Sequence, residues 1–238
     1  YGTGTISIIY EDYYKYDKYQ KGDLRMYTGN YECLELFVKS DEGKKGSVLL
    51  KNVKESTTET KELKHIYGNW IKFPVSRNTE YEISTQDCTI TFAYLSECEN
   101  IMENGICVLD TTDNYKEMNK EEFLRFIDTP YREQYHFSPV VNWNNDPNGL
   151  CWFKGYYHLF YQLNPFGQEW NNMYWGHAAS KDLMHWTHLP VALEPQEEIL
   201  DNLAIKGGAF SGSALPMGDE VYLSDLRMTD GTLFSIRQ

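Results

Sequence analysis

The heptapeptide Trp143-Asn144-Asn145-Asp146-Pro147-Asn148-Gly149 is the stretch from which the second half of this chain can be interpreted. Pro147 disfavours the helical conformation for the residue before it, so Asp146 is expected to be extended. Asn148-Gly149 is a pair that tolerates positive φ angles and favours a reversing turn. The stretch therefore predicts a tight turn that holds one carboxylate in a fixed direction. Because Asp-Pro-Asn-Gly alone is an ordinary turn sequence, its meaning depends on its flanks.

Four motifs flank this heptapeptide, and a linking segment at 180–195 accompanies them. They are YREQYHFSP at 131–139, QLNP at 162–165, WNNMYWGHA at 170–178 and FSGSA at 210–214. Their order and spacing resemble glycoside hydrolase family 32, the β-fructosidases that include invertase, levanase and inulinase. The resemblance runs over residues 131–214. It departs from the family pattern at Asn144, where the family often has Met, and at Tyr174, where it often has His.

The resemblance implies a five-bladed β-propeller and a glycosidase that retains anomeric configuration. Asp146 would then be the nucleophile that forms a covalent fructosyl intermediate. Amide groups can bind sugar hydroxyls, and an aromatic ring can cover the apolar face of a sugar. By residue-by-residue comparison, the fructose subsite would be lined by Asn145, Gln162, Trp170, Phe210 and Ser211.

The second catalytic carboxyl group is missing from this sequence. Glycoside hydrolysis commonly needs two carboxyl groups, and the family carries an Arg-Asp-Pro and a Glu-Cys motif downstream of its Phe-Ser-Gly-Ser. Arg-Asp-Pro does not occur here, and the two Glu-Cys pairs, Glu32-Cys33 and Glu97-Cys98, stand upstream, so neither is expected to be the acid. A propeller blade takes roughly 40 to 45 residues, so residues 131–238 are too few for five blades. We therefore expect a fragment or an internal deletion.

Composition agrees with a neutral sugar as the ligand. The formal net charge of −13 lacks a basic stripe, which argues against nucleic acid and anionic membranes as partners. Aromatic residues make up 15% of the chain, and aromatic walls with a few polar groups suit sugar binding. Five of the six tryptophans fall within 44 residues, and at least two of these are expected in the core: Trp143, Trp152, Trp170, Trp175 and Trp186.

The cysteines and histidines indicate neither a disulfide framework nor a metal site. The five cysteines are odd in number and show no pair at the spacing of zinc or redox motifs. Buried free thiols are expected, which favours a cytoplasmic location. The chain opens with Tyr1, so a removed leader and secretion stay open. His136 and His177 lack a second ligand at metal-binding spacing and are expected to be structural. No metal or cofactor is predicted, and the oligomeric state is left open.

The expected fold class is all-β, with an N-terminal β-sandwich-like accessory domain followed by the first part of a five-bladed propeller. The sandwich would occupy residues 1–117, because short strands alternate with turn clusters there. A linker at 118–130 would contain a helix over 120–127, capped by Asn119. The partial propeller would occupy 131–238. The predicted strands are 31–38, 47–53, 69–75, 81–84 and 89–95, followed by hairpins at 150–162 and 209–223.

The leading hypothesis is a retaining β-fructosidase that cleaves terminal β-fructofuranosyl bonds in sucrose or a β-fructan. A fructosyltransferase uses the same site with a sugar as acceptor, and a non-catalytic fructan-binding protein would keep the aromatic subsite without the acid. The motifs present do not separate hydrolysis from transfer, endo from exo cleavage, or sucrose from sucrose 6-phosphate and fructan.

Overall fold

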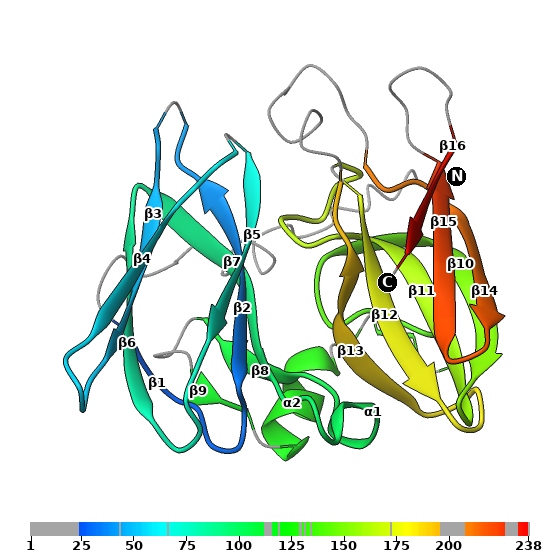
Figure 1. Cartoon of the computed structure of the whole chain (residues 1–238), viewed down its shortest axis with the longest axis horizontal. Coiled ribbons are helices and arrows are strands. Elements are labelled where there is room, and N and C mark those ends of the chain that lie inside the picture. Colours follow the sequence, from blue (N-terminus) through cyan, green and yellow to red (C-terminus); the bar gives the residue numbers. More distant parts are fainter. Residues whose placement is uncertain are drawn as a thin grey trace, which may run out of the picture.

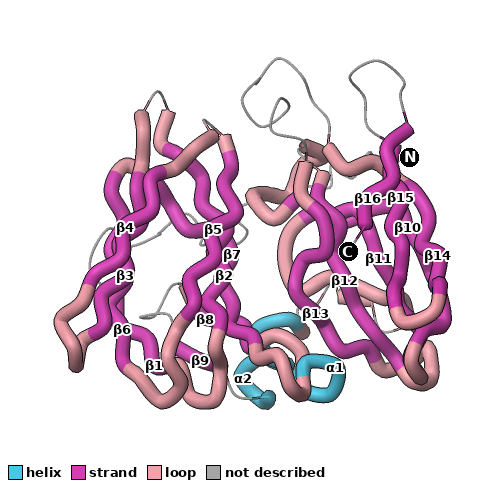
Figure 2. Tube along the Cα trace, in the orientation of Figure 1, coloured by secondary structure: helices cyan, strands magenta, loops and turns pink. Residues whose placement is uncertain are grey.

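The computed structural model describes residues 24–42, 44–65, 67–111, 116–118, 120–128, 130, 132–133, 135–171, 173–195, 208–226 and 233–237. Antiparallel strands dominate and form four sheets in two groups that stand side by side (Figure 1). Two helices, α1 (Ile101–Asn104) and α2 (Lys120–Ile127), lie together at one end of the junction between the groups (Figure 2). The predicted all-β class is confirmed. None of the helices in this described part is long and apolar enough to span a membrane.

The upstream group is a sandwich of two sheets with a hydrophobic core between them. One sheet has the order β1-β6-β3-β4 and the other β5-β2-β7-β8-β9. Side chains that alternate between buried and partly exposed along β3 show why these residues form a half-buried strand. The strands are β1 (Leu24–Tyr27), β2 (Cys33–Ser40), β3 (Ser47–Asn52), β4 (Thr58–Glu62), β5 (Gly68–Pro74), β6 (Glu80–Gln86), β7 (Cys88–Ser96), β8 (Cys107–Asp110) and β9 (Lys116–Glu117).

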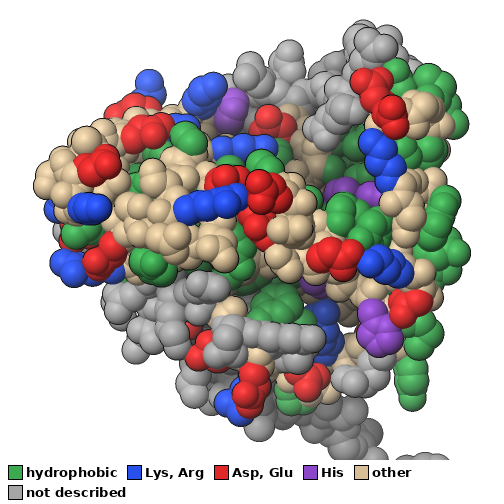
Figure 3. All heavy atoms as spheres, turned by 60° about the horizontal axis from the view of Figure 1, so that its bottom comes forward, with side chains coloured by type: hydrophobic (Ala, Val, Ile, Leu, Met, Phe, Trp, Pro, Cys, Tyr) green, Lys and Arg blue, Asp and Glu red, His purple; other side chains and the backbone are tan. Residues whose placement is uncertain are grey.

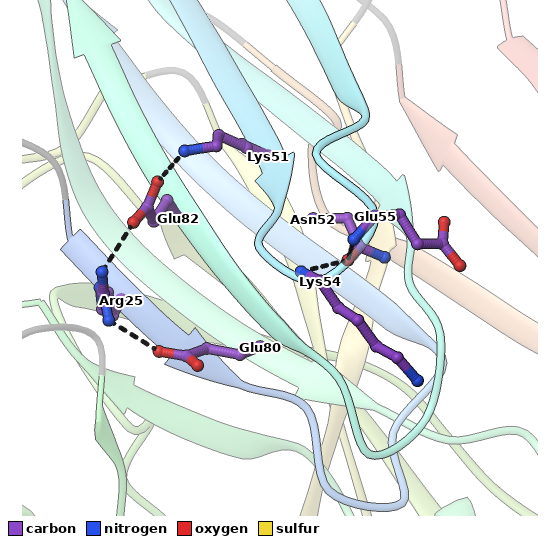
Figure 4. A network of polar contacts seen from close by, with 7 residues as sticks. All are labelled: Arg25, Lys51, Asn52, Lys54, Glu55, Glu80 and Glu82. Carbon is purple, nitrogen blue, oxygen red and sulfur yellow. Dashed lines mark hydrogen bonds and ion pairs between the residues drawn. The ribbon is translucent and has the colours of Figure 1, made fainter.

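The outer sheet turns a charged face to solvent. Arg25 on β1 contacts Glu80 and Glu82 on β6 at 3.3 and 3.1 Å, and Lys51 on β3 contacts Glu82 at 2.6 Å (Figure 4). Such exposed ion pairs contribute little to stability, but they mark the face that the core does not use. The polar edge strand β4 belongs to the same sheet and was not predicted.

The downstream group consists of two antiparallel sheets in the manner of propeller blades. Strands β10 (Trp143–Phe153), β11 (Tyr156–Asn164), β12 (Tyr174–Ser180) and β13 (Trp186–Leu193) form a four-stranded meander. Strands β14 (Gly212–Met217), β15 (Glu220–Leu226) and β16 (Leu233–Arg237) form the second sheet, with β14 beside β10. Both predicted hairpins are confirmed, and φ angles of 45° and 87° at Lys154 and Gly155 make the tight turn of the first.

Apolar side chains are exposed along β10 and β14, the adjacent edge strands of the two downstream sheets. They gather at the side of the molecule that lies away from the sandwich (Figure 3). Leu150 and Trp152 on β10 are 60% and 54% exposed, and Leu215 and Met217 on β14 are 58% and 50% exposed. Large exposed apolar patches are unusual on a finished surface, so this side agrees with a propeller that is only partly present.

Three local predictions have mixed outcomes. The helix α2 has the predicted bounds, and Arg125 and Glu121 form an ion pair one turn apart at 2.5 Å; the predicted cap, Asn119, lies outside the described residues. The predicted tight turn at 146–149 is wrong, because the whole heptapeptide lies inside β10. The five cysteines are free, as expected, but only Cys88 and Cys107 are buried, and Cys98 is exposed.

An aromatic seam joins the sandwich to the first blade. We use the term for the cluster in which Phe37, Phe92 and Tyr94 of the sandwich pack against blade residues, among them Tyr161 and Tyr174. The cluster also contains Val108, Leu159, Leu163, Phe166, Ala178 and Val191. Within the described residues, no sheet contains strands from both sides of residue 117, although the core continues across. The division at 117 and 131 stays a prediction.

Phe37→Ala is expected to loosen both sides of the seam. The Phe37 side chain is fully buried against Trp70, Phe92, Tyr94, Phe166 and Tyr174, so its truncation should cost about 3–5 kcal/mol of unfolding free energy. Denaturant unfolding measures that loss, and hydrogen exchange should rise in both β2 and β12.

Leu34→Ala is the matched control, because Leu34 is equally buried but belongs to the sandwich core alone. Its effect on hydrogen exchange should stay within the sandwich. If Phe37→Ala also left the exchange of β12 unchanged, the seam would not couple the two groups.

Two histidines of the first blade contact each other, with His158 buried and His177 partly buried. His158 Nδ1 lies 3.0 Å from His177 Nε2, and the His177 ring stacks on Phe160 at 4.3 Å between centroids. Burial lowers the pKa of His177 to about 3, with a smaller effect from His158, and burial also lowers the pKa of His158. Both rings are therefore neutral near pH 7, and His177 is a structural histidine, as predicted.

The blade should lose stability in mild acid. The pKa of unfolded histidine is about 6.5. Because the folded pKa of His177 is depressed to about 3, its unfolded form binds protons first as the pH falls. The unfolding free energy that this group contributes above pH 6.5 is thus lost progressively toward pH 3.

Urea unfolding midpoints measured at several pH values should fall less steeply with decreasing pH in His177→Gln than in the wild type. His136→Gln, at an exposed histidine, should keep the wild-type slope. Equal slopes in all three proteins would refute this account.

Candidate active site

A β-bulge in β10, and not a turn, directs Asp146. Asn144 pairs with Leu163 and Pro147 pairs with Tyr161, so Asn145 and Asp146 stand together opposite Gln162. An extra residue of this kind bends the strand and turns a side chain in a new direction. Pro147 is tolerated because β10 is the edge strand of its sheet.

The carboxylate of Asp146 is exposed and hydrogen-bonded at one oxygen. The hydroxyl of Ser211 donates to Asp146 Oδ2 at 2.8 Å. In the same bulge, the half-buried Asn145 accepts a hydrogen bond at Oδ1 from Trp143 Nε1, at 3.1 Å. The hydroxyl of Ser211 thus orients the carboxylate of Asp146 and leaves it exposed to solvent.

The segment 209–211 brings the predicted residues together. Gln162 Nε2 donates to the carbonyl oxygen of Ala209 at 2.8 Å, and Phe210 stacks on Trp170 with ring centroids 6.3 Å apart and planes 23° apart. Ser211 then reaches Asp146. The structure therefore gathers Asp146, Gln162, Trp170, Phe210 and Ser211 around three consecutive residues, with Asn145 in the adjoining bulge.

The buried Gln162 serves this site differently from the sequence-based expectation. Its side chain is only 2% exposed, and its amide nitrogen is hydrogen-bonded to the carbonyl oxygen of Ala209. Gln162 therefore supports the backbone of segment 209–211 from the buried side. Trp175 does the same and was not predicted as a site residue. Its indole nitrogen lies 3.0 and 3.1 Å from the carbonyl oxygens of Ala209 and Phe210. Trp175 is opposite Gln162 in the β11–β12 register, but its sequence motif gives no sign of this role.

The tryptophans divide between core and surface. Trp175 is fully buried, and Trp186 packs partly buried against the seam, whereas Trp152 is 54% exposed and both Trp143 and Trp170 are 37% exposed. Two exposed indoles thus lie at the site: Trp143 is in the same strand as Asp146, and Trp170 stacks on Phe210.

His136 is exposed and contacts Glu133 at 2.5 Å. In the part of the chain that the structure describes, His, Cys, Asp and Glu nowhere gather in threes that could hold a metal ion.

Gly149→Ala, in a second register shift of β10 between Asn148 and Cys151, should cost more stability than backbone strain alone requires. Gly149 has φ of +49°, and a Cβ there would lie 2.8 Å from Ala214 Cβ and 3.0 Å from Ala214 N on β14. We expect a loss of about 2–4 kcal/mol from left-handed strain plus overpacking.

Gly218→Ala is the matched control, because Gly218 also has positive φ, +62°, but a Cβ there would meet nothing within 4 Å. It should lose only about 1–2 kcal/mol. Denaturant unfolding of both variants checks the difference, and equal losses would mean that the contact with β14 is unimportant.

Comparison with known proteins shows which family these motifs are similar to. The model of the glycosyl hydrolases family 32 N-terminal domain matches residues 136–226. A levanase of Bacillus subtilis is 56% identical over 90 residues, which are 38% of this chain and 12% of the levanase. An extracellular exo-inulinase of Aspergillus niger is 65% identical over 66 residues, 28% of this chain and 12% of the inulinase. A sucrose-6-phosphate hydrolase of Zymomonas mobilis is 38% identical over 126 residues, 52% of this chain and 24% of that protein.

A solved structure of a glycoside hydrolase family 32 protein from Bifidobacterium adolescentis is similar over most of the chain. The TM-score is 0.74 at 31% identity, covering 90% of this chain and 36% of that one. Such coverage exceeds the family match, so the likeness includes the sandwich. The chain spans 12% to 24% of the lengths of the three curated relatives named above. Residues 136–226 therefore correspond to a fragment of the glycosyl hydrolases family 32 N-terminal domain.

Proposed function

We propose that this chain contributes the nucleophile half of a retaining β-fructosidase site. The observation that carries the proposal is the hydrogen bond between Ser211 and Asp146, because it joins two motifs that are 65 positions apart in the chain. A carboxylate that is held at one oxygen and exposed to solvent suits nucleophilic attack.

In the proposed reaction, an Asp146 carboxylate oxygen attacks the anomeric carbon of a terminal β-fructofuranosyl unit. The glycosidic C–O bond breaks, and the departing oxygen takes a proton from a general acid. Water, deprotonated by the same group, then attacks the anomeric carbon and releases Asp146. Trp170 and Phe210 would wall the sugar with their stacked rings. Ser211 would keep Asp146 aligned through both steps.

Neither Glu-Cys pair of this chain offers the general acid. Glu32 contacts Arg77 in the sandwich at 2.9 Å. Glu97 is buried and accepts a hydrogen bond from Asn104 at 2.5 Å. Both carboxyl groups are thus engaged within the upstream half of the chain, which supports assigning the acid to a part of the catalytic domain that this sequence does not contain.

The substrate class is a β-fructofuranoside. The relatives are named for levan, inulin and sucrose 6-phosphate, and a fructofuranosyl unit is common to all three. Fructosyl transfer remains an alternative with the same nucleophile. A non-catalytic fructan-binding protein is the second candidate, because the stacked rings of Trp170 and Phe210 would serve binding without an acid. The charge of −13 supports a neutral sugar over nucleic acid or an anionic membrane as the partner.

The 238-residue chain alone should hydrolyse sucrose very slowly. General acid assistance is worth about 10²- to 10⁴-fold, so turnover should lie at least that far below an ordinary rate of about 10 s⁻¹. Joining the chain to the downstream catalytic segment of a family relative should restore turnover. Asp146→Asn in the joined protein should abolish it and leave the circular dichroism spectrum unchanged.

Three outcomes separate the candidates. Ordinary turnover by the isolated chain would contradict the need for a missing acid, and activity in Asp146→Asn would contradict the nucleophile. Fructan binding by the isolated chain with no turnover in the joined protein would favour the binding protein.

A further inference from the structure

The loop at 165–171, which carries Trp170, is held from the propeller side by hydrogen bonds. Asn164 accepts a bond from Phe166 N at 3.0 Å and donates to the carbonyl oxygen of Glu169 at 2.8 Å. Trp143 N, at the start of β10, donates to the carbonyl oxygen of Gly167 at 3.1 Å. These bonds fix the first part of the loop, and Trp170 itself lies beyond them.

The sandwich contacts the same loop through a bulge in β7. Phe37 pairs with Phe92 and Val38 with Ile90, so Thr91 is the extra residue between them. Its hydroxyl lies 3.0 Å from the carbonyl oxygen of Phe37 and 3.1 Å from that of Pro165. The bulge therefore directs a polar side chain of the sandwich at the base of the loop.

Tyr67, between β4 and β5, is the side chain of the sandwich that contacts this loop through its ring. The ring meets Phe166 edge to face at 5.9 Å. Its hydroxyl is directed to the other end of the loop, where the side chain of Asn171 lowers the hydroxyl's pKa and so partly offsets the larger, raising effect of burial. The hydroxyl is therefore neutral near pH 7.

The fit between the sandwich and the loop is tight. A Cβ on Gly68 would lie 2.5 to 2.8 Å from atoms of the Phe166 ring, so the glycine allows the backbone of the sandwich to approach that ring. Phe166 is also 5% exposed and packs on Phe37 at 6.0 Å between centroids. The loop thus has little freedom to move away from Tyr67.

We propose that Tyr67 is a positioning residue of the sugar subsite: the sandwich holds loop 165–171 through Tyr67 and thereby keeps Trp170 stacked on Phe210. The meaning of Trp170 as a sugar-binding wall rests on the proposed function, whereas the positioning of the loop does not. Tyr67 touches no reacting atom and acts through Asn171 and Phe166.

Hydrogen exchange of the 238-residue chain tests the positioning without any sugar. Tyr67→Ala, which removes the ring and the hydroxyl, should speed exchange at 166–171 roughly threefold to tenfold. Tyr67→Phe should have a smaller effect, confined to the residues next to Asn171. Tyr27→Ala is the matched control, because Tyr27 is a half-exposed tyrosine of the same sandwich whose hydroxyl bonds Asn78. It should leave the loop unchanged.

Tyr67→Phe decides the matter if Tyr67→Ala fails to fold, because it keeps the ring that packs on Phe166. Unchanged exchange of the loop in the folded Tyr67 variants would overturn the proposal, as would an equal effect of Tyr27→Ala.

Binding of a β-fructan oligosaccharide, followed by tryptophan fluorescence, tests the functional part. Trp170→Phe should abolish the signal, and Tyr67→Ala should weaken binding roughly threefold to tenfold. If the protein joined to the downstream catalytic segment binds no fructan while the exchange effect persists in the 238-residue chain, the proposed function fails and the positioning stands. If Tyr67→Ala binds fructan as tightly as the wild type, Tyr67 has no part in the subsite, and the proposed function stands.

Discussion

The burial of β11 on both faces is the constraint on which the rest of this structure depends. Seven consecutive residues of the strand, 158–164, are buried. Leu159, Tyr161 and Leu163 face the seam, and Phe160 and Gln162 alternate with them toward the second sheet. A strand covered on both sides cannot slip by one residue without exchanging its two faces. The register of β10 against β11, and with it the bulge that directs Asp146, follows from this.

The seam also contains a polar chain that sets its geometry. Val191 N donates to the hydroxyl of Tyr94 at 3.1 Å, and that hydroxyl donates to Glu35 Oε2 at 2.9 Å. Trp70 Nε1 donates to the same oxygen at 2.7 Å. Burial raises the pKa of Glu35 even though Lys72 lies 3.8 Å away and lowers it. Directional bonds of this kind require one arrangement of sandwich and blade, which apolar contacts alone would not specify.

The family departure at Tyr174 has its explanation in the same seam. The side chain is fully buried, and its ring meets Phe37, Trp70 and Phe166 edge to face at 5.6 to 6.3 Å. An aromatic ring is suited to a site enclosed by aromatic rings from the sandwich. The difference from the family pattern therefore lies at the contact between this blade and the sandwich.

Sequence alone predicted those elements whose signal is local. Alternating residues located five sandwich strands, and Lys154-Gly155 located a hairpin turn, because both patterns come from neighbours in the chain. Asp146-Pro147-Asn148-Gly149 misled for the same reason: its turn signal is local, and pairing with the doubly buried β11 overrode it. Only the positive φ at Gly149 remains from the expected turn.

The parts of the site that the sequence did not predict depend on contacts between distant segments. Tyr67 and Thr91 belong to no motif, and the motif that contains Trp175 gives no sign of its role; all three roles arise from a packed seam and two bulged strands. The proposed nucleophile and the proposed aromatic wall consequently have separate supports. Asp146 is held within the propeller by Ser211, whereas the loop that bears Trp170 packs against the sandwich. On this proposal, sequence change in the sandwich alters the wall that a sugar would meet while the carboxylate stays in place, so the sandwich belongs to the physical description of the site.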